Sequence, residues 1–246
     1  MHHINMVRAR YGTGVFLKLN KRNCGMRIRL TPYDYDYLKV HWRIDSDNYY
    51  FLASCVMGSQ FSAFLSAVYG LYEEEDHLHY LHTKYDRNIT HEYPYRREDG
   101  RYKTEAKIFW DGEGPFYTIT FTRISENREP VLDPKTPDPV QIKIKSSEQP
   151  DKECTVDGRD LCYAVARGCT EALKKYGFKG YTLSTGGSYI GDGFNIEELL
   201  FVKAYALNAL EVCKAKLEWR NPKPNYLGKA KSTSFADELE LLLFDM

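Results

Sequence analysis

Three histidines lie close together beside a run of acidic residues, and imidazole and carboxylate groups are common ligands of zinc and non-haem iron. The histidines are His77, His79 and His82, which follow the acidic residues 73–76. On a helix, His79 and His82 share a face that His77 does not, and on a strand, His77 and His79 share a face that His82 does not. The spacing therefore predicts a solvated segment, and we expect no bound metal ion.

A glycine-rich segment, residues 184–194, precedes a predicted helix. Backbone N–H groups and the helix dipole make such a place a potential anion site. Its candidate anion-binding residues are Gly186, Gly187, Ser188 and Gly193. The segment lacks the lysine of GxxxxGK[ST] and the spacing of GxGxxG, so we interpret it as a flexible connection whose glycines permit positive φ. A small-molecule-binding or anion-binding enzyme that uses this loop and Asp192 is the alternative.

Cysteine is the other candidate for chemistry. Cys162 and Cys169 fall on or beside the inward stripe of one predicted helix. A reactive thiolate needs partial exposure and positive surroundings, so we expect two small core residues. The sequence has no GxSxG nucleophile elbow. We therefore assign no catalytic residue and no cofactor, and we expect a non-enzymatic protein, with an enzyme as the alternative.

Tyrosine is unusually frequent, with 20 residues among 246. Tyr33, Tyr35 and Tyr37 alternate with aspartates and form the densest group. Tyrosine offers a large amphipathic contact area at low entropic cost, which explains its enrichment at protein interfaces. We therefore predict that these three residues contact a partner protein. Stacking on nucleic-acid bases is a second choice, and a compositional bias without function is the alternative to both.

The charge of the whole chain is balanced, with 34 basic and 34 acidic residues. No global field attracts nucleic acid or an anionic membrane, so we expect neither as a partner. A locally basic N-terminal arm, which carries seven basic residues and no acidic one over residues 8–29, keeps nucleic-acid binding as an alternative. No apolar stretch is long enough to span a membrane, and the N-terminus has no apolar run of the signal-peptide type. We therefore expect a cytoplasmic protein.

The periodicity predicts an α+β fold in which an antiparallel β-sheet is packed by three or four amphipathic helices. Alternating segments predict strands over 26–30, 37–44, 103–109, 116–124 and 140–145, and helical spacing predicts a helix over 59–72. The turn residues 111–115 predict a hairpin, and the proline-rich connection 130–139 predicts an exposed loop.

Two further helices follow in the last third. Asp157 is placed to cap the first, with Asp160 at N3, and Gly177 is placed to end it after Tyr176. The second begins with a capping-box spacing of Asn195 and Glu198 and is expected to run to about Trp219. Its apolar arc is wide enough to be sandwiched in the core or to face a partner.

The C-terminal segment is predicted to be an appendage. Residues 1–219 form one α+β domain, with a subdomain division near 150 as an alternative, residues 220–231 form a linker, and residues 232–246 form an amphipathic helix. Its apolar face is made by Phe235, Leu239, Leu242 and Leu243. Such a helix either binds another protein, a second copy included, or docks on its own domain.

Together these patterns favour a non-catalytic binding protein. We expect it to engage or mask a protein partner, as toxin-neutralising and inhibitor proteins do, and this expectation rests on analogy.

Overall fold

The chain folds into two antiparallel sheets covered by helices. The computed structural model describes residues 25–33, 37–54, 60–72, 89–111, 115–126, 129–184, 196–208, 242 and 246. The three-stranded sheet contains β1 (Met26–Tyr33), β2 (Tyr37–Ile44) and β3 (Asp47–Ser54), in that order. The five-stranded sheet contains β4 (Ile89–Arg96), β5 (Tyr102–Asp111), β6 (Phe116–Ser125), β7 (Pro139–Ser146) and β8 (Lys152–Asp157), also in sequence order.

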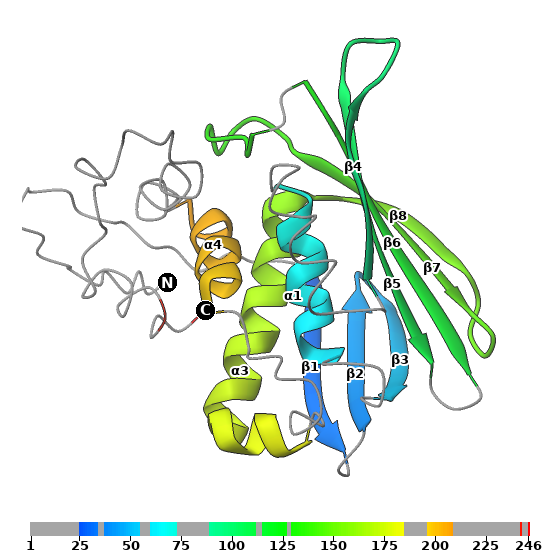
Figure 1. The fold of residues 1–246 in the computed structure, drawn as a ribbon, viewed down its shortest axis with the longest axis vertical. Helices are drawn as coiled ribbons and strands as arrows, with labels where there is room; N and C mark the ends of the chain where they lie inside the picture. Colours follow the sequence, from blue (N-terminus) through cyan, green and yellow to red (C-terminus); the bar gives the residue numbers. More distant parts are fainter. Residues whose placement is uncertain are drawn as a thin grey trace, which may run out of the picture.

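The described helices are α1 (Gln60–Gly70), α3 (Gly158–Ser184) and α4 (Ile196–Ala206). They gather on one side of the strands, and the five-stranded sheet curves away beside them (Figure 1). The α+β class is confirmed, but the strands form two sheets where one was expected. A fourth helix and the C-terminal appendage stay predictions, because most of residues 209–246 lie outside the described part of the chain.

Strict alternation explains why the strands have one buried face. Leu38, Val40, Trp42 and Ile44 are buried along β2, whereas Lys39 and Arg43 between them are exposed. The predicted hairpin is also confirmed, since β5 pairs with β6 from Tyr102 opposite Ser125 to Asp111 opposite Phe116. Each sheet therefore turns its apolar side toward the helices and its polar side away from them.

Aromatic side chains join the two sheets into one core. The Trp42 ring of β2 lies edge-on to Phe64 of α1 at 5.3 Å and within 6.0 Å of Phe121 in β6. Phe51 of β3 meets Tyr117 of β6 edge-on at 5.1 Å. These contacts bridge both sheets and α1, so no boundary divides the hydrophobic cluster of the described residues.

Helix α3 lies directly on β1 and begins as predicted. The Asp157 carboxylate accepts a hydrogen bond from Arg159 N at 2.9 Å, which is an N-cap contact. A Cβ atom at Gly168 would lie 2.8 Å from the Ile28 carbonyl oxygen, so only glycine permits this close packing on β1. Gly177 has the predicted positive φ of 66°, but helical residues resume after this break and continue to Ser184.

Helix α4 is shorter than predicted. It ends at Ala206, and Asn208 adopts a φ of 55°, the left-handed conformation that commonly ends a helix. The expectation that the helix continues to Trp219 is therefore wrong. The helix is buried on all sides from Glu198 to Ala206, as a sandwiched helix should be, and the Glu198 carboxylate accepts a hydrogen bond from Ser66 of α1 at 2.7 Å.

Candidate functional site

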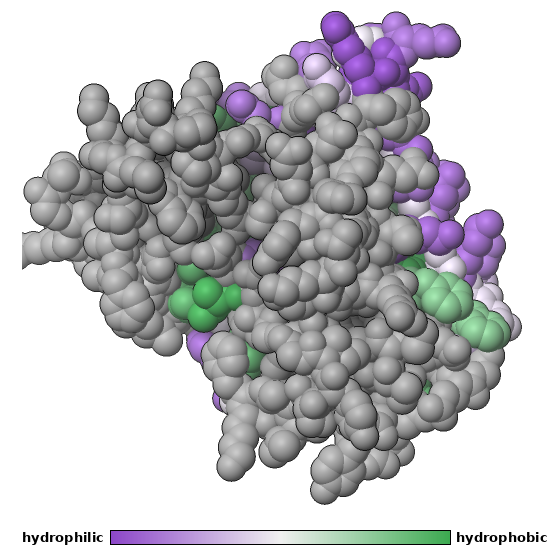
Figure 2. Space-filling view, viewed as in Figure 1, coloured by the Kyte–Doolittle hydropathy of each residue, from purple (hydrophilic) through white to green (hydrophobic). Residues whose placement is uncertain are grey.

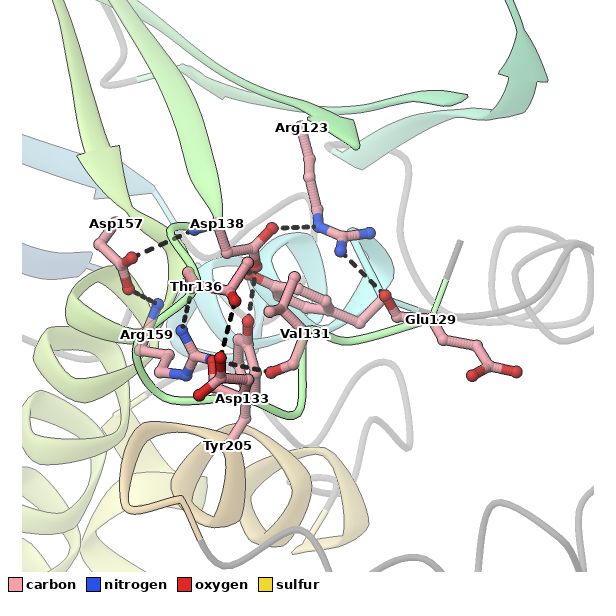
Figure 3. Close-up of polar contacts among 10 residues, drawn as sticks. Arg123, Glu129, Val131, Asp133, Thr136, Asp138, Asp157, Arg159 and Tyr205 are labelled. Atoms are coloured by element: carbon pink, nitrogen blue, oxygen red, sulfur yellow. Dashed lines mark hydrogen bonds and ion pairs between the residues drawn. The ribbon is translucent and has the colours of Figure 1, made fainter. Parts of the chain in front are cut away.

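The most concentrated polar chemistry in the described residues surrounds one buried carboxylate, Asp138, which directly precedes β7 (Figure 3). Its Oδ1 accepts a hydrogen bond from Arg123 Nε at 2.8 Å, and the two residues are 0% and 1% exposed. Its Oδ2 accepts hydrogen bonds from the hydroxyls of Tyr72 at 2.9 Å and Tyr205 at 2.6 Å. A carboxylate that takes an ion pair and two hydroxyl donors compensates for its loss of water.

The backbone around Asp138 is fixed as well. Its N–H donates to the Asp157 carboxylate at 3.2 Å, and its carbonyl accepts from Gly158 N at 2.7 Å. A Cβ atom at Gly158 would collide with the Tyr72 hydroxyl, so glycine at the first position of α3 lets the hydroxyl reach the carboxylate. The start of α3 and the start of β7 are thereby locked together.

A second buried arginine binds the loop that leads to Asp138. Arg159 donates to the carbonyl oxygens of Thr136 at 3.0 Å and Asp133 at 2.7 Å, and also to Val131 (Figure 3). Its guanidinium lies 5.1 Å from the centre of the Tyr205 ring, an arrangement that favours a cation–π interaction. The guanidinium therefore donates hydrogen bonds to three backbone carbonyl groups that would otherwise accept them from water, and this fixes the loop.

The protonation state of the buried hydroxyl and thiol groups decides whether this cluster can act in catalysis. Burial is the main reason why the pKa values of Tyr72, Tyr205 and the neighbouring Cys162 thiol are raised above their ordinary values, and the Asp138 charge raises them further. All three groups therefore keep their protons at neutral pH, and a protonated thiol is a poor nucleophile. Because the polar groups are buried and bound to one another, we interpret the Asp138 cluster as a structural clamp.

The sequence analysis missed this clamp because it treated residues 130–139 only as an exposed loop. Leu132 to Pro137 are exposed as expected, but Asp138 is fully buried, so the expectation fails at that residue. One signal was available. Arg123 follows Tyr117, Ile119 and Phe121 on the inward side of β6, and an arginine at an inward position requires a buried acceptor.

An exposed aromatic pair lies on the outer face of the five-stranded sheet. Phe109 of β5 and Phe116 of β6 are 41% and 50% exposed, and their rings stack at 5.8 Å with an interplanar angle of 23°. Thr118 lies directly opposite Phe109 across the strand pair. Figure 2 shows hydrophobic side chains at the edge of the molecule where this sheet lies, next to strongly hydrophilic ones. This pair is accessible without any rearrangement.

The predicted site residues fall mostly outside the described region. Tyr33 and Tyr37 face each other in the β1–β2 register, but the structure does not describe their side chains or any part of Tyr35. Gly186, Gly187, Ser188 and Gly193 also lie outside it, as do Phe235, Leu239, Leu243 and the histidines 77–82. Cys162 and Cys169 are buried in α3, as predicted for core cysteines.

Two residues of the predicted C-terminal helix are described, and both contact the core. Leu242 is partly buried against the hydrophobic cluster, and its carbonyl oxygen accepts a hydrogen bond from Lys203 Nζ of α4 at 2.9 Å. Met246 is buried. This arrangement supports the self-docking alternative for these two residues.

Among the described residues, His, Cys, Asp and Glu side chains form no group of three or more that could hold a metal ion. In the same part of the chain, no helix has both the length and the apolar character that crossing a membrane requires. The whole chain matched no known protein family, no characterised protein and no solved structure in our comparisons.

Proposed function

We propose that this chain is a non-catalytic binding protein that engages or masks a protein partner, as toxin-neutralising and inhibitor proteins do. The observation that supports the proposal most directly is the exposed stack of Phe109 and Phe116 on the outer face of the five-stranded sheet. Aromatic side chains are enriched among the residues that contribute most binding energy at protein interfaces. A polar rim is the usual setting for such anchors, and Thr118 of β6 lies directly opposite Phe109 on the same face.

The physical argument rests on what these two rings cost in the free protein. Each exposed apolar Å² is worth about 25 cal/mol when it is removed from water, so a stacked pair that remains half-exposed forgoes much of that stabilisation. A partner that covers both rings recovers it. The clamp around Asp138 adds support, because its buried polar groups hydrogen-bond to one another and so stabilise the scaffold.

The proposal is tested by affinity capture from native lysate with purified chain, followed by quantification of bound protein. We expect a stoichiometric partner that is retained by the unmodified chain and lost with Phe109→Ser/Phe116→Ser. Leu132→Ser is the matched control, because it also removes an exposed hydrophobic side chain but from a different surface. Equal recovery by the double variant and the control would contradict the proposal, and so would the absence of any stoichiometric protein.

A further inference from the structure

The outer face of the three-stranded sheet carries an unusual set of side chains. Twelve of its positions point outward in four rows across β1, β2 and β3, as given by the strand register, and the structure describes the side chains of nine of them, in three rows. The rows are Arg27, Arg43 and Asn48; Arg29, His41 and Tyr50; and Thr31, Lys39 and Leu52. Four of the nine are arginine or lysine and none is acidic. We call these nine residues the basic face.

An exposed aromatic stack lies within the basic face. The rings of His41 and Tyr50 lie 4.5 Å apart and are nearly parallel, at 6°, and Tyr50 is 60% exposed. Lys39 and Arg43 are the diagonal neighbours of Tyr50 on β2, which places their Cα atoms about 7–8 Å from that of Tyr50. Arg29 lies on the other side of His41. A planar stack is therefore flanked by positive charges on the same surface.

The Gln149 side chain holds the backbone of Tyr50 in place, although β3 is an edge strand. The Gln149 side chain accepts a hydrogen bond from Tyr50 N at 3.1 Å and donates one to Tyr50 O. Asn48 adds a contact from the same strand, since its side-chain oxygen lies 2.9 Å from His41 Nε2. The stack is thus fixed before any ligand arrives, which lowers the entropic cost of binding.

Two charges of the basic face, those of Arg29 and Arg43, are available to a ligand. Arg27 pairs with Glu171 of α3 at 3.4 Å, whereas Arg29 and Arg43 are exposed and form no ion pair with any described residue. Among the described residues, the aspartates of this sheet are Asp45 and Asp47 at its β2–β3 turn, and Asp47 is paired with Lys152. The ligand should therefore be an anion that also offers a planar ring.

We propose that the basic face binds single-stranded nucleic acid, with a base continuing the His41–Tyr50 stack and phosphates contacting Arg29 and Arg43. Base stacking on aromatic rings beside basic groups is the general mode of single-strand binding. Size favours this ligand over an acidic protein. Between its outermost Cα atoms, the basic face measures only about 10 by 14 Å. This area is far smaller than the roughly 800 Å² that a stable protein interface buries on each partner.

The sequence analysis did not expect nucleic acid as a partner because the net charge is zero, and it kept nucleic-acid binding as an alternative through the basic N-terminal arm, residues 8–29. The net charge does not show how the basic residues are distributed. The basic positions of β1 and β2 alternate with apolar core positions and therefore fall on one face. In the sequence, the segment before β1 contains five more basic residues, Arg8, Arg10, Lys18, Lys21 and Arg22, and it lies outside the described residues. This inference does not depend on the proposed protein partner, which concerns the other sheet.

The test measures fluorescence anisotropy with a labelled single-stranded DNA of about twelve nucleotides, a length within the range that single-strand-binding modules cover. We expect binding at low salt, with a slope of log K against log salt of about −1.4 for two phosphate contacts. Tyr50→Ala should weaken binding by about five-fold or more, whereas Tyr50→Phe should retain it because the ring remains. The melting temperature of each variant checks that the fold is intact.

A charge-matched pair of variants separates the basic face from general electrostatic attraction. Arg29→Glu/Arg43→Glu should abolish binding, whereas Lys107→Glu/Lys145→Glu makes the same change in net charge on the other sheet and should weaken it far less. Equal losses from the two double variants would overturn the proposal. So would the absence of binding by the unmodified chain, an unchanged affinity of Tyr50→Ala, or equally effective competition by polyglutamate.

Discussion

Removing the Asp138 carboxylate should be among the most destabilising single substitutions in this protein. In Asp138→Ala, the buried Arg123 guanidinium loses its counter-charge, and loss of one partner of a buried ion pair costs about 3–5 kcal/mol. The Tyr72 and Tyr205 hydroxyls lose their common acceptor, and each unsatisfied buried group adds about 1–3 kcal/mol. Because a domain is typically stable by only about 5–15 kcal/mol, we expect this variant to be unfolded or close to it.

Graded variants separate the charge from the hydrogen bonds. Tyr205→Phe removes one donor and leaves the ion pair intact, so we expect a loss of about 1.5–3 kcal/mol, the range for hydrogen bonds to a charged group. Arg123→Met/Asp138→Leu removes both charges and should be less destabilised than Asp138→Ala alone, since no unpaired charge stays buried. This ordering is the signature of a buried ion pair.

The assay is urea unfolding followed by circular dichroism, with free energies from linear extrapolation. Asp47→Ala is the matched control, because it breaks an ion pair with Lys152 at the surface, where water replaces the lost partner. We expect little change from the control. If Asp138→Ala unfolded at the same urea concentration as Asp47→Ala, the assignment of Asp138 as a buried clamp would be wrong.

Two further predictions concern the C-terminal segment and alkaline pH. Deleting residues 232–246 should lower the melting temperature in differential scanning fluorimetry, because Lys203 loses the Leu242 carbonyl and buried Met246 is removed, and an unchanged temperature would contradict self-docking. Burial, followed by its hydrogen bond to Glu148, raises the pKa of Tyr117 from 10.0 to about 12. The folded state therefore keeps a proton that the unfolded chain loses, so this contribution is complete below pH 10 and disappears as the pH rises toward 12. Tyr117→Phe should accordingly show a shallower fall of the urea midpoint over that interval, and an equally steep fall would refute the link.

Local patterns predicted the elements that have one buried face. The alternation of β2 and the N-cap at Asp157 depend on neighbours within a few residues along the chain, so the sequence alone determined them. The hairpin of β5 and β6 was predictable for the same reason, because its turn residues and its two alternating strands are adjacent. Local physics is sufficient wherever the interaction partners are close in sequence.

The failures concern interactions between distant residues. Arg123 and Asp138 are separated by a loop, and Tyr72 and Tyr205 come from segments on either side of both, so no local pattern indicates that they meet. The division into two sheets is likewise decided by which strand edges pair. The end of α4 at Ala206, just before the left-handed Asn208, was missed because apolar residues continue beyond it at helical spacing in the sequence.

The charge of a surface depends on where the charged residues lie in the fold and not on the composition of the chain. On the outer face of the five-stranded sheet, Lys103 pairs with Glu105 along β5 at 3.0 Å and Lys143 pairs with Glu153 from β7 to β8 at 3.4 Å. The basic face of the three-stranded sheet has no acidic residue at any outward position. The same alternating pattern thus produces one surface that carries both signs of charge and one on which Arg29 and Arg43 have no acidic partner among the described residues. Since long-range attraction depends on the local field and not on the sum over the chain, a protein of zero net charge can still present a surface suited to polyanions.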